Sequence, residues 1–345
     1  MYTCSTKYES FQDEKIGILV TNLGTPDSPD KKSLKRYLKE FLSDPRVVEP
    51  PPARWIWKLI LNAIILNTRP KRSSRAYKSV WGRFGKGSPL LDISIQQKEL
   101  IQQYLNEKFN NIYEVELGMR YGNPSIKSAL EKLEKLGCNK ILVFPLYPQY
   151  AASTTGSTFD AVADTFKSYR KVPEIRFINS YHEDEGYIQA LANSVKGFQK
   201  INGKPDVLLM SYHGIPRRYF DNGDSYPCNC CKTTYLLSKK LNLKVNDYKM
   251  SYQSRVGRDE WIKDYTDKTL INFPSNGVKS VQVICPGFSA DCLETIEEIE
   301  EENKGYFLES GGVEYKYIPA LNYHKDHIGC LANIIIEKTS DWIKK

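Results

Sequence analysis

The sequence contains no apolar run of about 18 residues, the length that a membrane-spanning helix needs. Its first 15 residues, MYTCSTKYESFQDEK, are polar and lack the hydrophobic core of a signal peptide. No long block of Lys or Arg is present, so the net charge of +8 favours acidic small molecules or an anionic membrane surface over nucleic acid. Eight cysteines without an export signal indicate free thiols in a reducing cytosol, and we expect a cytoplasmic protein.

Several nucleotide-binding and hydrolase motifs are also missing. No GxGxxG follows the first predicted strand, and the glycine-rich stretch GRFGKGSP (82–89) lacks the ending of a Walker motif, which leaves a plain loop or an anion site. No GxSxG elbow is present. A serine hydrolase that uses Ser211 and His213 is therefore disfavoured.

The hydrophobic pattern predicts an α/β protein. Apolar strands alternate with helices of 10–16 residues, which indicates βαβ units and parallel sheets. The pattern occurs twice, so we expect two similar doubly wound, Rossmann-like halves, each with a mainly parallel sheet flanked by helices. The expected division is 1–165, 166–322 and a C-terminal helix, 323–345, that packs back on the first half.

Strands and helices are expected at defined ranges. The predicted strands are 15–26, 113–122, 140–148, 174–181, 206–214, 247–255, 280–288 and 315–321. The predicted helices are 33–42, 94–109, 125–137, 186–201, 233–243, 268–277, 291–312 and 327–345.

The segment 50–72 has an apolar centre with two tryptophans and a basic end. One interpretation is a core helix with a solvated cap. The other is a lip that moves or touches a membrane, because Trp beside Lys and Arg suits an interface. The composition does not decide between the two.

His213 is one of only four histidines and stands where the apolar run VLLMS ends. A histidine near a core is often structural. Ligands of doubly wound sheets, however, bind outside the carboxyl ends of the strands, which is where this imidazole is expected.

A row of glutamates follows the strand 280–288. Glu294, Glu297, Glu298 and Glu301 fall at i, i+3, i+4 and i+7, one stripe of an α-helix. Such a stripe is commonly a solvated face, but this helix begins at the same sheet edge as His213. An imidazole beside carboxylates suits transient metal binding or proton transfer at neutral pH.

Cys228, Cys230 and Cys231 form a thiol cluster in PCNCCKT. Their CxCC spacing is not that of the paired motifs of structural zinc sites. With a further ligand they make a weak candidate for an iron–sulfur cluster, and surface thiols are the simpler interpretation.

Five stretches resemble the ferrochelatase family. LLMSYHGIPRRYFDNGDSY (208–226) resembles its signature, and the other four are LGMRYGNPS, FPLYPQYAASTTGST, YQSRVGRDEWIKDYTD and CPGFSADCLETIEE. The resemblance runs from about residue 22 to about residue 322 and is greatest to the Gram-negative type of bacterial protoporphyrin ferrochelatase. It implies a chelatase-like fold and a lyase that inserts Fe(II) into protoporphyrin IX, the last step of haem synthesis, with release of two protons and no required cofactor.

The resemblance also implies roles for individual residues. His213 and Glu294 match the metal-handling and proton-accepting pair, and Glu298 matches the next carboxylate of a proton or metal path. Which of them accepts the pyrrole protons stays open. The implied porphyrin contacts are Leu23, Ser88, Arg120, Tyr121 and Trp261, together with Arg69, Lys71 and Arg72 for the propionates.

The sequence departs from the family pattern in three places. Cys292 stands where many members have a histidine, which puts a two-histidine mechanism in doubt. Ala152 replaces a cluster cysteine of the animal enzymes, and their cysteine-bearing C-terminal extension is not seen after DWIKK. A [2Fe–2S] cluster is therefore not expected.

Two alternatives stay open. One is a chelatase for coproporphyrin or a sirohydrochlorin-type ring, and the other is a haem or porphyrin carrier without catalysis. Peripheral contact with the inner face of the membrane through 50–72, and contacts with neighbouring haem-pathway enzymes, are further expectations.

Overall fold

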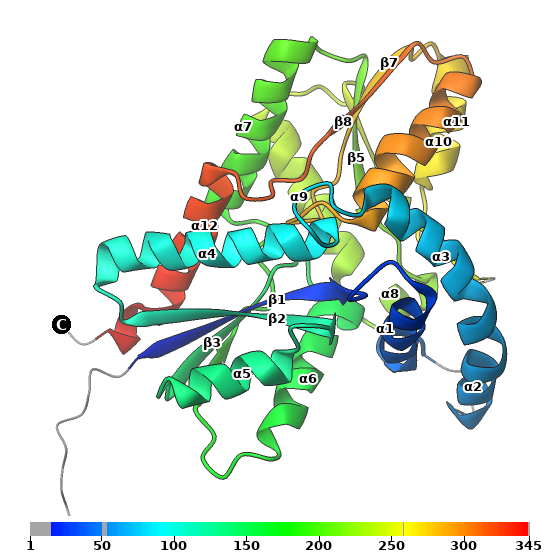
Figure 1. Cartoon of the computed structure of the whole chain (residues 1–345). Helices are drawn as coiled ribbons and strands as arrows, with labels where there is room; N and C mark the ends of the chain where they lie inside the picture. The colour runs from blue at the N-terminus through cyan, green and yellow to red at the C-terminus, as the bar shows by residue number, and fades with distance from the viewer. Residues whose placement is uncertain (1–14, 50–53, 258, 344–345) are drawn as a thin grey trace, which may run out of the picture.

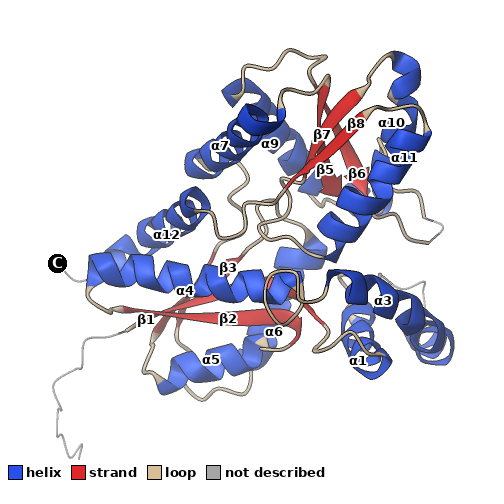
Figure 2. Ribbon diagram, turned by 45° about the horizontal axis from the view of Figure 1, so that its top comes forward, coloured by secondary structure: helices blue, strands red, loops and turns tan. Residues whose placement is uncertain are grey.

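The computed structural model describes residues 15–49, 54–257 and 259–343, and within them eight strands form two parallel sheets. Sheet A has the order β2-β1-β3-β4 and sheet B the order β6-β5-β7-β8. In each half the first strand lies between the two strands that follow it in the sequence. Figure 2 shows the two sheets as separate layers covered by helices. The strands are β1 (Ile16–Thr25), β2 (Tyr113–Gly122), β3 (Lys140–Pro145), β4 (Glu174–Phe177), β5 (Val207–His213), β6 (Tyr248–Gln253), β7 (Ser280–Ile284) and β8 (Glu314–Ile318).

Helices cover both faces of each sheet, as expected for doubly wound halves. In the first half they are α1 (Lys31–Ser43), α2 (Arg54–Ile60), α3 (Leu66–Val80), α4 (Pro89–Phe109), α5 (Ile126–Lys135) and α6 (Ser157–Phe166), with π-helical turns η1 (Leu61–Ile65) and η2 (Ala152–Gly156). In the second half they are α7 (Glu185–Asn202), α8 (Arg217–Asp221), α9 (Tyr226–Lys240), α10 (Thr266–Asn272), η3 (Pro274–Asn276), the π-helix η4 (Glu294–Glu302), α11 (Asn303–Glu309), α12 (Lys325–Thr339) and η5 (Ser340–Trp342).

The two halves share one hydrophobic core. The helix α12 lies beside α4 of the first half and α7 of the second (Figure 1). Buried Gln97 of α4 donates hydrogen bonds of 2.9 Å to the carbonyl oxygens of Ser289 and Asn322 in the second half. These contacts hold the carboxyl edges of both sheets toward one another.

The predicted fold class is confirmed, because every predicted strand is present and both sheets are parallel. Several helices differ from their predictions, since α4 begins at Pro89 and not at residue 94, and α6 and α8 were not predicted. The predicted helix 233–243 begins earlier, at Tyr226, and so includes the three clustered cysteines. The helix predicted over 291–312 is a π-helix, η4, followed by the α-helix α11.

The segment 50–72 is helical where the structure describes it, and residues 50–53 lie outside that part. It consists of α2, η1 and the start of α3, which continues to Val80. Across the described residues, every helix is too short or too polar to pass through a bilayer.

Candidate active site

His213 is the last residue of β5 and is half-buried at the carboxyl edge of sheet B. Its Nδ1 lies 2.7 Å from the carbonyl oxygen of Gly214. Because a carbonyl oxygen only accepts, Nδ1 carries the proton, and Nε2 of the neutral ring keeps the lone pair that can take a proton or bind a metal. The indole of Trp261 lies next to the imidazole, with 6.5 Å between the ring centroids.

Gln253 connects His213 to the acidic helix. It ends β6, directly beside His213 in the strand register, and its carbonyl accepts a hydrogen bond of 2.8 Å from Gly214 N–H. Its side chain is buried, accepts from Ser211 Oγ and donates through Nε2 to the carbonyl oxygen of Glu294 at 3.3 Å. Gln253 therefore links the backbone next to His213 to the backbone of Glu294, the first residue of η4.

Glu298 lies one turn further along η4. Burial raises the pKa of its carboxyl to about 7, although hydrogen bonds from the Ser254 hydroxyl and backbone N–H act in the opposite direction. The charges of Glu294 and Glu302 raise the pKa of Glu298 further. A carboxyl group that titrates near neutral pH is suited to accept and release protons.

The predicted stripe of Glu294, Glu297, Glu298 and Glu301 lies in the π-helix η4 and not in an α-helix. A π-helix places more residues in each turn than an α-helix, because its hydrogen bonds span i to i+5. Glu294 and Glu302, whose charges raise the pKa of Glu298, stand four residues before it and four residues after it, and Glu301 is exposed. Glu294 and Glu298 are thus neighbours at the predicted i, i+4 spacing, and the shared face of all four glutamates stays a prediction.

Two buried tyrosines of the first half face Glu294. Burial, and after it neighbouring charges that include Glu294, raise the pKa of Tyr37 on α1 and of Tyr77 on α3. Burial and then Glu294 also raise the pKa of the Cys292 thiol, so this residue is a neutral thiol where many family members have an imidazole. The helix α3 packs against η4, and the site is thus walled by both halves.

Arg120 and Tyr121, at the carboxyl end of β2, are held by a buried carboxylate. Asp44, just after α1, accepts hydrogen bonds from Arg120 Nη2 and from the Tyr121 hydroxyl at 2.8 Å. Ser157 donates to the same carboxylate and accepts from Arg120 Nε at 2.6 Å. Burial opposes the charge of Asp44, but these hydrogen bonds and the guanidinium outweigh it and lower the pKa of Asp44.

Leu23 and Ser88 have different surroundings. Leu23 is half-buried and packs against two apolar clusters, one containing Tyr121 and the other containing Cys292. It therefore stands between the Arg120 network and the start of η4. Ser88 is buried and caps α4, where its Oγ accepts a hydrogen bond from Leu91 N–H.

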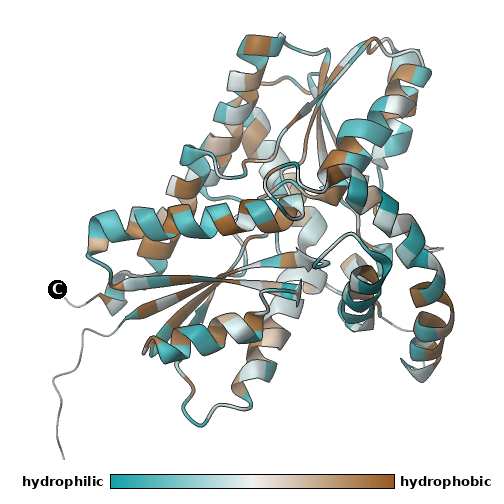
Figure 3. Cartoon of the chain, viewed as in Figure 1, coloured by the Kyte–Doolittle hydropathy of each residue, from teal (hydrophilic) through white to brown (hydrophobic). Residues whose placement is uncertain are grey.

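The predicted propionate-binding cations lie on α3, after the apolar part of the 50–72 segment. Arg69 is half-buried and Lys71 is exposed, while the side chain of Arg72 is outside the described part of the structure. Before them, α2 and η1 expose Trp55, Leu59 and Ile64, each about 60% accessible. Figure 3 shows hydrophobic colouring along the helical segment at the edge of the first half that contains α2 and η1.

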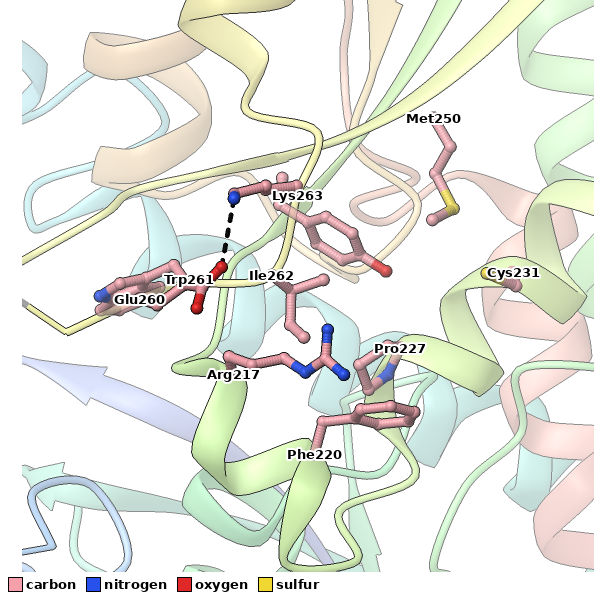
Figure 4. A pocket seen from close by; sticks show the side chains of 10 residues that line it. Arg217, Phe220, Pro227, Cys231, Met250, Glu260, Trp261, Ile262 and Lys263 are labelled. Carbon is pink, nitrogen blue, oxygen red and sulfur yellow. Dashed lines mark ion pairs between the residues drawn. The ribbon is translucent and has the colours of Figure 1, made fainter.

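The cysteine cluster does not converge. Cys228 and Cys231 are exposed, and Cys230 is buried in the core. Among the described residues, no group of three or more His, Cys, Asp or Glu side chains is placed to hold a metal ion. A cavity of about 300 Å³ is lined by Cys231 and Trp261 among other residues, and none of the η4 glutamates lines it (Figure 4).

Several residues of this region were not predicted from the sequence. Asp44, Tyr77, Gln253 and Ser254 make the contacts described above, and Tyr147 is a tyrosine whose hydroxyl is buried without a partner. Burial, and then the neighbouring Tyr121, raise the pKa of Tyr147, which places it beside the Arg120 network. Gln253 lies inside the predicted strand 247–255, and its place near the carboxyl end of that strand is the signal that could have found it.

Two parallel, doubly wound halves with an imidazole and carboxylates at one sheet edge define a chelatase-type protein. The sirohydrochlorin chelatase SirB from Bacillus subtilis, in a structure with Fe³⁺, aligns with a TM-score of 0.55 over 95% of this chain and 98% of its own, at 12% identity. A SirB structure in complex with cobalt aligns at 0.54 over 95% and 96%, at 13% identity. At these identities the likeness concerns the fold alone.

The sequence comparisons are more specific. The ferrochelatase family model matches residues 15–339. The ferrochelatase of Hydrogenovibrio crunogenus is 56% identical over 99% of this chain and 90% of its own, and that of Idiomarina loihiensis is 52% identical over 99% and 93%. The chain belongs to the ferrochelatase family. It is therefore an enzyme of the lyase class, a metal chelatase that inserts iron into a porphyrin for haem synthesis.

Proposed function

We propose that this ferrochelatase inserts Fe(II) into protoporphyrin IX, and that His213, Glu294 and Glu298 handle the metal and the two pyrrole protons. The observation that carries the proposal is that Gln253 links the backbone beside His213 to the backbone of Glu294 at the carboxyl edge of sheet B. Metal insertion needs a base and a metal-handling group on the same side of a flat ring. An imidazole with a free Nε2 lone pair, next to a row of carboxylates, supplies both.

The three groups have different roles. His213 Nε2 and the Glu294 carboxylate bind the arriving iron transiently or take a pyrrole proton. Glu298, whose pKa is about 7, accepts the released proton and passes it along η4 toward the exposed Glu301 and Glu302. Fe(II) is a substrate in this scheme, and no resident cofactor or [2Fe–2S] cluster takes part.

The porphyrin lies between the Arg120 network and η4. Leu23 stands between these two regions, and Trp261 borders His213, so both offer apolar surface to a flat ring. The cations of α3 pair with the two propionates. The proposed contacts are Leu23, Ser88, Arg120, Tyr121 and Trp261, with Arg69, Lys71 and Arg72 for the propionates.

The exposed apolar residues of α2 and η1 support peripheral membrane contact at the inner face of the membrane of a cytoplasmic protein. Trp55, Leu59 and Ile64 are exposed next to the cations Arg54 and Lys58, the pattern of an interfacial helix. Protoporphyrin carries only two charged groups on a large apolar ring and partitions into membranes. A site that opens near the bilayer therefore receives this substrate directly.

An insertion assay with iron or zinc, using protoporphyrin IX and coproporphyrin III, tests the proposal. We expect protoporphyrin to be preferred, and H213A and E294Q to lower the rate about 100-fold or more while the porphyrin absorption titration still shows binding. Faster turnover of coproporphyrin would replace the substrate. Unimpaired rates in both variants would overturn the residue assignment, and porphyrin binding without insertion by the wild type would indicate a carrier.

A further inference from the structure

Two exposed thiols stand together on α9, apart from the proposed active site. Of the seven cysteines in the described part of the chain, Cys138, Cys230, Cys285, Cys292 and Cys330 are buried, and only Cys228 and Cys231 are exposed. Cysteine is among the most buried residue types, so two accessible thiols side by side need an explanation. They are three residues apart, which places them on the same side of one helical turn.

The geometry of this turn suits a bond between the two sulfur atoms. Cα atoms three residues apart in an α-helix are separated by about 5 Å, which lies within the range of about 4.4–6.8 Å found in disulfides. Both thiols lie near the N-terminus of α9, which begins at Tyr226. The first four backbone N–H groups of a helix have no intrahelical acceptor, so the backbone of this first turn is less constrained than the helix interior.

A small molecule can reach the pair. Cys231 lines the cavity of about 300 Å³, together with Pro227, Phe220, Met250, Tyr252 and Trp261 (Figure 4). Burial, and after it the neighbouring Cys228, raise the pKa of the Cys231 thiol, which agrees with two sulfur atoms that lie close together.

We propose that Cys228 and Cys231 are a thiol–disulfide modification site that reacts with low-molecular-weight disulfides. Cys228 attacks one sulfur of the small disulfide, forms a mixed disulfide and releases one thiol. Cys231 then attacks the Cys228 sulfur, closes the intramolecular disulfide and releases the second thiol. Two protein thiols are oxidised, one small disulfide is reduced to two thiols, and both protein protons leave with the released thiols.

Closing this bond also acts on Trp261. Pro227 and Cys231 share the cavity wall with this indole, whose ring lies 6.5 Å from that of His213. A shift of the first turn of α9 therefore changes the surroundings of Trp261, and its fluorescence reports the change.

The test uses the full chain and glutathione disulfide as the probe. After oxidation in the folded state, unfolding and alkylation, we expect the peptide 219–232 to have lost two hydrogens and to carry one alkylated thiol, that of Cys230. Dithiothreitol should restore all three thiols. C231S should stop at one glutathione on Cys228, whereas C230S should still close the disulfide.

Three outcomes would overturn the proposal. They are a wild type that keeps the glutathione adduct without closing, a disulfide that is lost in C230S, and a peptide whose three thiols all stay reduced. If C230S does not fold, the position of the single alkylated thiol in the wild-type peptide decides the pairing. An oxidation-dependent fluorescence change that persists in W261F would contradict the coupling to Trp261.

Discussion

The backbone N–H of Ser254 donates a hydrogen bond of 2.8 Å to the carboxyl group of Glu298, and the Ser254 hydroxyl donates to its other oxygen. Ser254 follows β6 with a φ of +66°, in the left-handed region that non-glycine residues rarely adopt. The two hydrogen bonds tie this unusual turn to η4. The end of β6 and the proposed proton path are thus held together by one residue pair.

The raised pKa of Glu298 predicts a pH-dependent stability. Its folded-state pKa of about 7 lies above the ordinary 4.5, so the folded protein holds a proton that the unfolded chain loses between these values. Stability is therefore lost as the pH rises through this window. We expect E298Q to match the wild type near pH 4.5 and to exceed its free energy of unfolding at pH 8, measured by urea denaturation. The exposed control E301Q should show no such divergence, and parallel curves for E298Q would refute the assignment.

Removal of the Asp44 carboxylate is expected to lower both the stability and the turnover of the enzyme. D44A leaves Arg120 without its carboxylate in a buried site, and breaking a buried ion pair costs about 3–5 kcal/mol. We expect the free energy of unfolding to fall by about this amount and the insertion rate to fall with it, because Arg120 and Tyr121 lose their shared acceptor. D160N, which affects the more exposed pair with Arg46, serves as the control and should cost less than about 1 kcal/mol. Equal effects of the two variants would contradict the role of Asp44.

A strand or helix could be predicted from the sequence where its hydrophobic pattern lies within the element itself. The strands β1, β5 and β7 are mostly apolar and almost wholly buried, and α1 buries Leu34, Tyr37, Leu38 and Leu42 at the expected spacing. The position of His213 followed from the strand that it ends. The π-helical turns did not follow, because the same acidic residues fit an α-helical period equally well.

The contacts of the site were less predictable, because they join distant parts of the chain. Asp44 and Arg120 are 76 residues apart, and Gln253 and Glu294 are 41 apart. No local pattern pairs such residues. A buried carboxylate is recognised only once the guanidinium, hydroxyl and serine around it are placed in space.

Replacement of Gln253 is expected to lower turnover by more than its effect on stability explains. Q253L removes the donor to the Glu294 carbonyl and the acceptor of Ser211, which should cost about 1–3 kcal/mol of stability and lower kcat about tenfold. Q282L is a matched control, because Gln282 is equally buried in β7 but donates to Gly203 at the opposite edge of sheet B. It should cost similar stability and leave kcat unchanged. The same kcat in both variants would show that Gln253 has a structural role alone.

The apolar surface of α2 and η1 predicts membrane binding that depends on position and not on exposure alone. Leu59 and Ile64 are 60% and 58% accessible, whereas Val245 and Ile201, in the second half, are 82% and 85% accessible. If the segment inserts among lipid headgroups beside Arg54 and Lys58, L59E and I64E should weaken sedimentation with anionic vesicles severalfold, and more at low salt. V245E and I201E should leave sedimentation unchanged, because their side chains lie away from this segment. A similar loss in all four variants would mean that binding follows net charge, and the segment would then be an ordinary solvated surface.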